Sequence, residues 1–291
     1  MAEVITSPSN PKIKRLLALQ QKSSARREAG LFVVEGQREL QHCIDAGFDI
    51  DTIFVCPALH GSQPPETSFG PHRCASLAVP PLTVPRVARF PEAAAAAAQP
   101  KVFEVDENVY AKIAMRESTE GIIAEVRIRE RRLEELELPE RPLVVVLESV
   151  EKPGNLGAVL RSADAAGADA VLICDPLTDL WNPNLIRASI GAVFTVPCVA
   201  CSSAEAIAFL KARGIRILTA QLQDSSLYYD CDMTVGTALV MGTEATGLTE
   251  VWREAADAHI RIPMLGALDS LNVSVSAAIL LFEAVRQRQN G

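Results

Sequence analysis

The second half of the chain alternates continuous apolar runs with helical segments, and this alternation restricts the fold more than any other feature. Leu143–Leu147 is an uninterrupted apolar run, the helical segment Asn155–Ala166 follows, and Ala170–Cys174 is apolar again. A strand without polar alternation is buried on both faces, and strands that alternate with helices form a parallel sheet. The sequence therefore predicts an α/β domain over residues 143–291.

The same pattern continues to the end of the chain. Strands or extended segments are expected at Phe194–Val199, Ile215–Ala220, Ala238–Gly242 and His259–Pro263. Helices are expected at Leu185–Ile190, Ala204–Arg213, Val251–Ala256 and Val273–Arg288. Ligands bind such sheets at the carboxyl ends of the strands, so the loops at those ends are the candidate sites.

Residues 1–128 predict a second, smaller α/β domain. Strands or extended segments are expected at Leu31–Val34, Ile50–Cys56, Val102–Val105 and Gly121–Ile128. Helices are expected at Pro11–Gln21, Arg38–Ala46, Ala93–Ala98 and Glu107–Ala114. The charged stretch 129–142, which ends in Pro-Glu-Arg-Pro, is typical of a linker and is expected to be partly helical.

Composition indicates a soluble globular protein, with 48% hydrophobic and 22% charged residues. No apolar run reaches the roughly 18 residues that span a bilayer, and Met1–Arg15 lacks the apolar core of a signal peptide. We therefore expect a cytoplasmic protein without a membrane partner. Seven irregularly spaced cysteines do not suggest a disulfide framework. The CxxC of Cys198 and Cys201 has no second pair to complete a zinc site, so these two are expected to be ordinary thiols beside a strand.

The net charge of −8 argues mildly against nucleic-acid binding, but phosphates respond to local patches rather than to net charge. One stretch is basic without any acidic residue. It contains Lys12, Lys14, Arg15, Lys22, Arg26 and Arg27. By itself this stretch is more typical of a solvated helical face than of an RNA site.

Three loops at strand ends have unusual composition. Glu148–Arg161 contains two glycines that permit close approach and Asn155 as a candidate helix cap, but neither a dinucleotide fingerprint nor a phosphate-binding Walker loop. In Gly242–Leu248 two glycines bracket Glu244, which could bind a hydroxyl, orient an arginine or complement a helix dipole. Ile262–Ser276 interleaves four polar residues with Leu and Val, more than one helix cap requires.

Taken together and in order, the three loops resemble the signature motifs of the SpoU (TrmH) family of SPOUT methyltransferases. The first motif corresponds to Pro153-Gly-Asn-Leu-Gly-Ala-Val-Leu-Arg161, the second to Gly242-x-Glu-x-x-Gly-Leu248, and the third to Ile262-Pro-Met through Ser270-Leu-Asn-Val-Ser274. The N-terminal half resembles the small RNA-binding domain often attached to this family, through Ser9-Asn-Pro-x-Ile-Lys14, Arg26-Arg-Glu28 and Phe32-Val-Val-Glu-Gly36. The second motif departs from many relatives at Thr243, Ala245 and Thr246.

The resemblance implies a C-terminal parallel sheet with a trefoil knot, a homodimer, and S-adenosylmethionine bound in the knotted loops. It implies cofactor contacts from Ala220, Leu222, Gly242, Gly247, Ile262 and Leu271. It implies that RNA is bound by the N-terminal domain, where the basic residues are Lys12, Lys14, Arg15, Arg26 and Arg27. No metal is expected, because the sulfonium already activates its methyl group.

The implied reaction is methyl transfer to a ribose 2′-hydroxyl. The resemblance gives the central catalytic role to Arg161, with Asn155, Glu244, Asn272 and Ser274 shaping the acceptor site. An arginine stays protonated, so we expect Arg161 to act as a fixed positive charge rather than as a base. Ribosomal RNA is the expected substrate. The alternatives are a transfer RNA methylase of the same family, a non-catalytic RNA-binding protein and, disfavoured by the missing GxGxxG, a dinucleotide-dependent enzyme.

Overall fold

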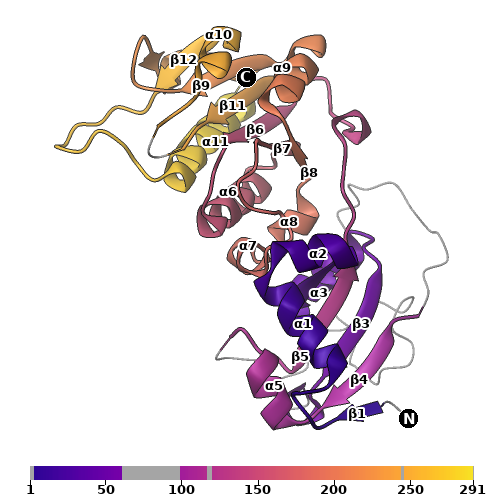
Figure 1. The fold of residues 1–291 in the computed structure, drawn as a ribbon. Helices are drawn as coiled ribbons and strands as arrows, with labels where there is room; N and C mark the ends of the chain where they lie inside the picture. The colour runs from indigo at the N-terminus through magenta and orange to yellow at the C-terminus, as the bar shows by residue number, and fades with distance from the viewer. Residues whose placement is uncertain (1–2, 61–98, 117–119, 244–245, 291) are drawn as a thin grey trace. The chain divides into compact units, whose positions relative to one another are not determined.

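The computed structural model describes residues 3–60, 99–116, 120–243 and 246–290. The chain divides into two compact units (Figure 1). The first unit consists of Met1–Arg129 together with Trp181–Thr195, and the second of Glu130–Leu180 together with Val196–Gly291. The expected helix at Ala93–Ala98 lies outside the described residues.

The first unit is built on a five-stranded mixed sheet with strand order β1-β4-β3-β5-β2. Its strands are β1 (Glu3–Ile5), β2 (Leu31–Glu35), β3 (Ile50–Val55), β4 (Lys101–Val105) and β5 (Ile122–Arg127). Its helices are α1 (Pro11–Gln21), α2 (Ser23–Ala29), α3 (Gln37–Asp45), α4 (Pro57–His60), α5 (Glu107–Ile113), α7 (Pro183–Ser189) and α8 (Ala192–Thr195). Strand β5 runs antiparallel to both of its neighbours, β2 and β3.

An aromatic cluster attaches Trp181–Thr195 to the sheet of the first unit. Phe32 of β2 stacks on Trp181, with ring centroids 4.6 Å apart, and Phe194 stacks on the same ring of Phe32 at 5.9 Å. Phe48 completes the cluster with edge contacts to Trp181 and Phe194. The expectation that Phe194 is extended was wrong. The residue lies in the short helix α8, whose buried side chains complete the core of the first unit.

The second unit is a seven-stranded, all-parallel sheet with strand order β10-β12-β9-β11-β6-β7-β8. Its strands are β6 (Leu143–Glu148), β7 (Ala170–Cys174), β8 (Cys198–Cys201), β9 (Arg216–Ala220), β10 (Ser226–Leu227), β11 (Thr237–Met241) and β12 (Ala258–Arg261). Its helices are α6 (Pro153–Ala165), α9 (Ser203–Ala212), α10 (Glu250–Ala255), α11 (Val273–Asn290) and the 3-10 turns η1 (Leu133–Glu135) and η2 (Tyr228–Asp230). The predicted parallel sheet is therefore confirmed.

Helices cover both faces of this sheet, which is why β6 is buried at every residue. Val144 and Val146 face a core cluster that includes Phe209 of α9 and Trp252 of α10. The intervening residues of β6 point to the opposite face, where α6 and α11 lie side by side (Figure 1). Among the described residues, no helix is both long and apolar enough to cross a membrane.

Candidate functional site

The sheet of the second unit brings the predicted loops to one edge. Strands β12, β9, β11 and β6 are successive parallel neighbours, so their carboxyl ends lie at the same edge of the sheet. The loops at 220–223, 242–247 and 262–271 leave β9, β11 and β12 there, and the first motif leaves β6. Because ligands of parallel sheets bind at this edge, the loops form the candidate site.

The loop after β11 is a tight turn whose two glycines have different roles. A Cβ on Gly242 would lie 2.2 Å from the carbonyl oxygen of Gly247, so no larger residue fits there without a backbone shift. Gly247 has a φ of +67°, which favours glycine. The Gly247 amide donates to the carbonyl of Thr243 at 3.0 Å and closes the turn. Glu244, expected in the acceptor site, lies outside the described residues.

A buried carboxylate that the sequence reasoning missed anchors the exit of this turn. Glu148, the last residue of β6, is only 3% exposed. Its carboxylate accepts hydrogen bonds from the backbone amide of Thr249 at 2.9 Å and from the Thr249 hydroxyl at 2.6 Å. Glu148 therefore joins the strand that precedes the first motif to the end of the second. The sequence signal that could have identified Glu148 is an acidic residue at the end of an otherwise apolar strand.

Ser203 of α9 extends this network away from the loops. Its hydroxyl donates to a carboxylate oxygen of Asp175 at 2.6 Å and accepts from the indole nitrogen of Trp252 at 2.8 Å. The same hydroxyl lies 3.5 Å from a carboxylate oxygen of Glu148. The network joins the buried residues Glu148, Ser203 and Trp252 to the exposed residues Asp175 and Thr249, and such connected hydrogen bonds hold their members in one arrangement.

Asn155, Asn272 and Ser274, which the motifs assign to the acceptor site, form a chain of hydrogen bonds that joins the first motif to the third. The side-chain amide of Asn272 donates to Oδ1 of Asn155 at 3.1 Å. Its own Oδ1 accepts from the backbone amide of Ser274 at 3.0 Å and from the Ser274 hydroxyl at 2.6 Å. Asn272 thus caps α11 while contacting α6. Asn155 is not a helix cap as expected, because Pro153 occupies the first turn and α6 begins there.

Arg161 is exposed on α6 and makes no ion pair or hydrogen bond with a described residue. It lies six residues beyond Asn155, which places it about 9 Å further along the helix axis and about 120° around it. The two side chains therefore do not contact each other through the helix. A ligand that binds both must be large enough to span this separation.

The remaining predicted cofactor loops combine exposed apolar side chains with one unsatisfied acceptor. Leu265 and Leu268 are 97% and 75% exposed, and Leu271 and Leu222 are also exposed. Next to Ala220, the side-chain oxygen Oε1 of Gln221 is buried and has no hydrogen-bond partner. A buried acceptor without a donor is costly, and a ligand donor would satisfy it.

The basic residues of the first unit are not equivalent. Lys12 pairs with Glu3 at 2.6 Å, and Arg15 pairs with the fully buried Glu125. Arg26 is 3% exposed and donates to the backbone carbonyl of Leu19 at 2.6 Å, so it has a structural role in α2. Of the five predicted RNA contacts, Lys14 and Arg27 are exposed and form no ion pair with a described residue.

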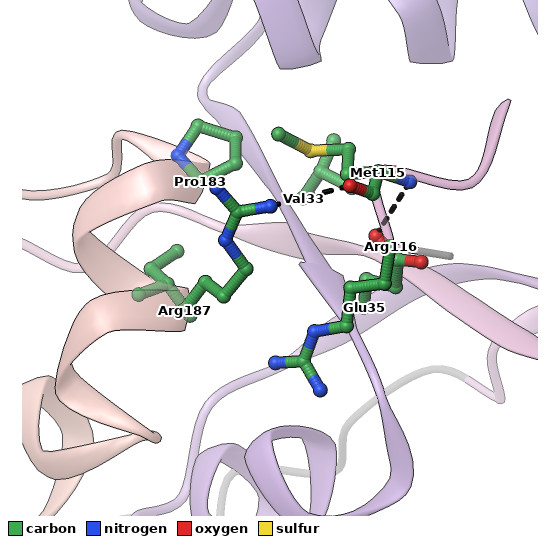
Figure 2. Close-up of a pocket in the computed structure, with 7 residues that line it drawn as sticks. Val33, Glu35, Met115, Arg116, Pro183 and Arg187 are labelled. Atoms are coloured by element: carbon green, nitrogen blue, oxygen red, sulfur yellow. Dashed lines mark hydrogen bonds between the residues drawn. The ribbon is translucent and has the colours of Figure 1, made fainter. Parts of the chain in front are cut away.

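The first unit also contains a cavity of about 10 Å³, room for no more than one water molecule (Figure 2). Arg187 donates to the carbonyl of Met115 at 3.2 Å, and the Met115 amide donates to Glu35 at 2.9 Å. The other carboxylate oxygen of Glu35 is buried without a partner, and burial raises the pKa of Glu35. The cavity is too small for a nucleotide.

Both halves of the chain match known families. The profile of the SpoU rRNA Methylase family matches residues 142–282, which include all three motif loops. The profile of the MRM3-like substrate binding domain matches residues 10–124. The 23S rRNA (guanosine-2'-O-)-methyltransferase RlmB of Pseudomonas putida is 37% identical over 179 residues, which cover 58% of this chain and 71% of the relative. The chain belongs to the SpoU rRNA Methylase family.

Further similar proteins include solved structures that the chain matches over nearly its full length. RlmB of Escherichia coli K12 is 39% identical over 176 residues, 58% of this chain and 72% of the relative. An RNA 2'-O ribose methyltransferase of known structure is 38% identical with a TM-score of 0.77, covering 98% of this chain and 99% of that one. An AdoMet-bound rRNA methyltransferase from Sinorhizobium meliloti is 28% identical with a TM-score of 0.80, covering 98% of both chains.

Proposed function

We propose that this SpoU family member transfers a methyl group from S-adenosylmethionine to a ribose 2′-hydroxyl of ribosomal RNA. The observation that carries the proposal is the contact between Asn155 and Asn272, which joins the first and third motifs at the carboxyl edge of the parallel sheet. The RlmB relatives act on 23S rRNA, and this favours ribosomal over transfer RNA.

The loops fit the proposed cofactor. The unpartnered Oε1 of Gln221 could accept a hydrogen bond from the adenine amino group, and the exposed leucines of the third loop could cover the adenine ring. The residues that would hold the cofactor are Ala220, Leu222, Gly242, Gly247, Ile262 and Leu271. Bound S-adenosylmethionine supplies a methyl group already activated by its sulfonium, which needs no metal ion.

The chain's own groups would act on the acceptor ribose. Arg161 carries a permanent positive charge that stabilises negative charge developing on the 2′-oxygen or holds the adjacent phosphate. Asn155, positioned by Asn272, would hold the ribose, and Ser274 would line the same pocket. We keep Glu244 as a further acceptor-site residue from the motif alone.

RNA would be held by phosphate contacts from the first unit. Lys14 and Arg27 are the principal candidates because they are exposed and form no ion pair with a described residue. Lys12 and Arg15 would contribute less, because their charges are partly neutralised by the pairs with Glu3 and Glu125. Arg26 would act indirectly, by holding the helix that carries Arg27.

A homodimer in the cytoplasm is part of the proposal. Val275 and Phe282 of α11 are 46% and 48% exposed and lie seven residues apart, on one stripe of the helix. A second copy of the chain would cover this stripe. The free chain would expose it to water, which is unfavourable for large apolar side chains.

Methyl transfer can be tested with labelled S-adenosylmethionine and RNA from a strain that lacks the gene, separated into ribosomal and transfer RNA. The proposal expects label in one ribosomal species, released by alkali as a resistant dinucleotide. Label in transfer RNA would instead support the transfer RNA methylase. Bound cofactor without any transfer, including transfer to ribosome-assembly intermediates, would indicate a non-catalytic RNA-binding protein.

A further inference from the structure

Two cysteine thiols meet at the carboxyl ends of β7 and β8. Cys174 and Cys201 are direct partners in the register of these parallel strands, and their Sγ atoms are 4.0 Å apart. Neighbouring strands lie about 4.8 Å apart, within the range of about 4.4–6.8 Å between Cα atoms that a disulfide spans. A bond between the two sulfurs therefore needs no large backbone movement.

The CxxC neighbour of Cys201 is excluded as its partner. Side chains three residues apart on a strand point to opposite faces, so Cys198 and Cys201 face away from each other across β8. The Cys198 thiol instead donates to the carbonyl of Val196 at 3.2 Å. Burial raises the pKa of Cys198 to about 12, which keeps it an unreactive thiol.

The two members of the pair differ in accessibility. Cys174 is fully buried and contributes to the core, whereas Cys201 is partly exposed. The hydrogen bond with Cys174 lowers the pKa of Cys201, while the same contact and burial raise the pKa of Cys174. Cys201 is therefore the group that an oxidant reaches first, and Cys174 lies behind it.

We propose that Cys174 and Cys201 form an oxidation site, at which a hydroperoxide produces an intrachain disulfide. The Cys201 thiolate attacks one peroxide oxygen and the O–O bond breaks, which gives a sulfenic acid and hydroxide. The Cys174 sulfur then attacks the Cys201 sulfur, the S–O bond breaks, and the leaving hydroxyl takes the thiol proton as water. In sum two thiols are oxidised by two electrons and the peroxide is reduced.

The bond would join the two ends of the segment that leaves the second unit. Residues 181–195 belong to the first unit, and Cys174 and Cys201 flank them on either side. The disulfide would thus close a covalent loop that contains residues 181–195. This site is separate from the methyl-transfer residues, so its test does not depend on methyltransferase activity.

The test treats the reduced full-length protein with hydrogen peroxide, blocks the remaining thiols with N-ethylmaleimide and digests it with trypsin. Cleavage after Arg161, Arg187 and Lys211 places Cys174 on one peptide and both Cys198 and Cys201 on the next. The expected product is a cross-link between peptides Ser162–Arg187 and Ala188–Lys211 that a phosphine reverses. A disulfide within the second peptide, or no disulfide on either, would overturn the proposal.

Three variants test which cysteine reacts with the peroxide and which one then forms the disulfide. Cys198→Ser is the matched control and should retain the cross-link, whereas Cys201→Ser should lose it. Cys174→Ser should leave a sulfenic acid on Cys201 that dimedone traps, because the resolving thiol is gone. Survival of the cross-link in Cys201→Ser, or absence of a dimedone adduct in Cys174→Ser, would contradict the assigned roles.

Discussion

The amide of Asn272 donates to Oδ1 of Asn155 across 117 positions of sequence, at 3.1 Å. The same side chain accepts from the backbone amide of Ser274, so one residue both starts α11 and holds the first turn of α6. The capping function and the contact between motifs can therefore be separated by substitution.

Asn272→Ser should reduce methyl transfer about tenfold or more and leave the melting temperature nearly unchanged. Serine is a good helix cap but is too short to reach Asn155. Asn272→Ala should lose activity and also about 1 kcal/mol of stability, since it removes the cap. Activity assays paired with thermal unfolding of both variants check this. Full activity in Asn272→Ser would show that the contact between motifs is dispensable.

Arg161→Ala should lower kcat by about two orders of magnitude or more, the range for losing a group that stabilises transition-state charge. Because the Arg161 side chain is exposed and makes no ion pair or hydrogen bond with a described residue, the free energy of unfolding should not change. Binding of S-adenosylmethionine, measured by calorimetry, should also be retained. Arg161→Lys keeps the charge without the planar fork and should recover only part of the rate. Equal rates for wild type and Arg161→Ala would remove Arg161 from the mechanism.

Glu148→Gln should weaken S-adenosylmethionine binding about tenfold and lower stability by about 1–3 kcal/mol. Glutamine replaces one of the two carboxylate oxygens that accept from the amide and the hydroxyl of Thr249 by a nitrogen that cannot accept. Asp175→Asn is the matched control. It touches Ser203 but not Thr249, and asparagine tolerates the φ of +48° at that position. The control should lose stability without losing cofactor affinity. Equal loss of affinity in both variants would mean that Glu148 acts only through general stability.

Gly242→Ala should abolish cofactor binding, because its Cβ would collide with the Gly247 carbonyl and force the turn open. Gly266→Ala in the neighbouring loop meets nothing within 4 Å and should bind normally. Equilibrium dialysis with labelled S-adenosylmethionine compares the two. Normal binding by Gly242→Ala would exclude this turn from the cofactor site.

Glu35→Gln should change how stability depends on pH. Burial raises the pKa of Glu35 above its ordinary 4.5, so the unfolded chain releases this proton at a lower pH than the folded chain does. The contribution of Glu35 to stability is therefore present in acid and lost as pH rises through the folded pKa. Glutamine has no charge to bury. The free energy of unfolding of the Glu35→Gln variant, relative to that of the wild type, should therefore be higher at about pH 7 than at about pH 4. Urea unfolding of both proteins at both pH values gives this free-energy difference. The same difference at both pH values would contradict the raised pKa of Glu35.

The parallel sheet was predictable because short apolar runs such as Leu143–Leu147 alternate with helical segments along the second half of the chain. The predicted bounds of helices and strands were wrong where another constraint outweighed the hydrophobic pattern. Pro153 starts α6 two residues before Asn155, and the apolar residues around Phe194 serve the core of another unit. Strand β1 and helix α2 were missed, since three residues carry little periodicity and Ser23–Ala29 has few apolar positions.

In the candidate site, too, some features were predictable from the sequence and others were not. The motif resemblance assigned Asn155, Asn272 and Ser274 to one acceptor site, but the hydrogen bonds among them are seen only in the structure. The ion pair of Arg15 with Glu125 and the anchoring of Thr249 by Glu148 depend on contacts between residues distant in sequence. No local pattern encodes such contacts.

The discontinuity of the first unit has a consequence for synthesis on the ribosome. When residue 129 has emerged, Phe32 and Phe48 still lack Trp181 and Phe194, which complete their cluster. At about 5–20 residues per second the missing segment follows only after a delay of several seconds. During that interval the nascent chain presents an apolar sheet face, and we expect chaperones that bind exposed apolar surface to occupy it.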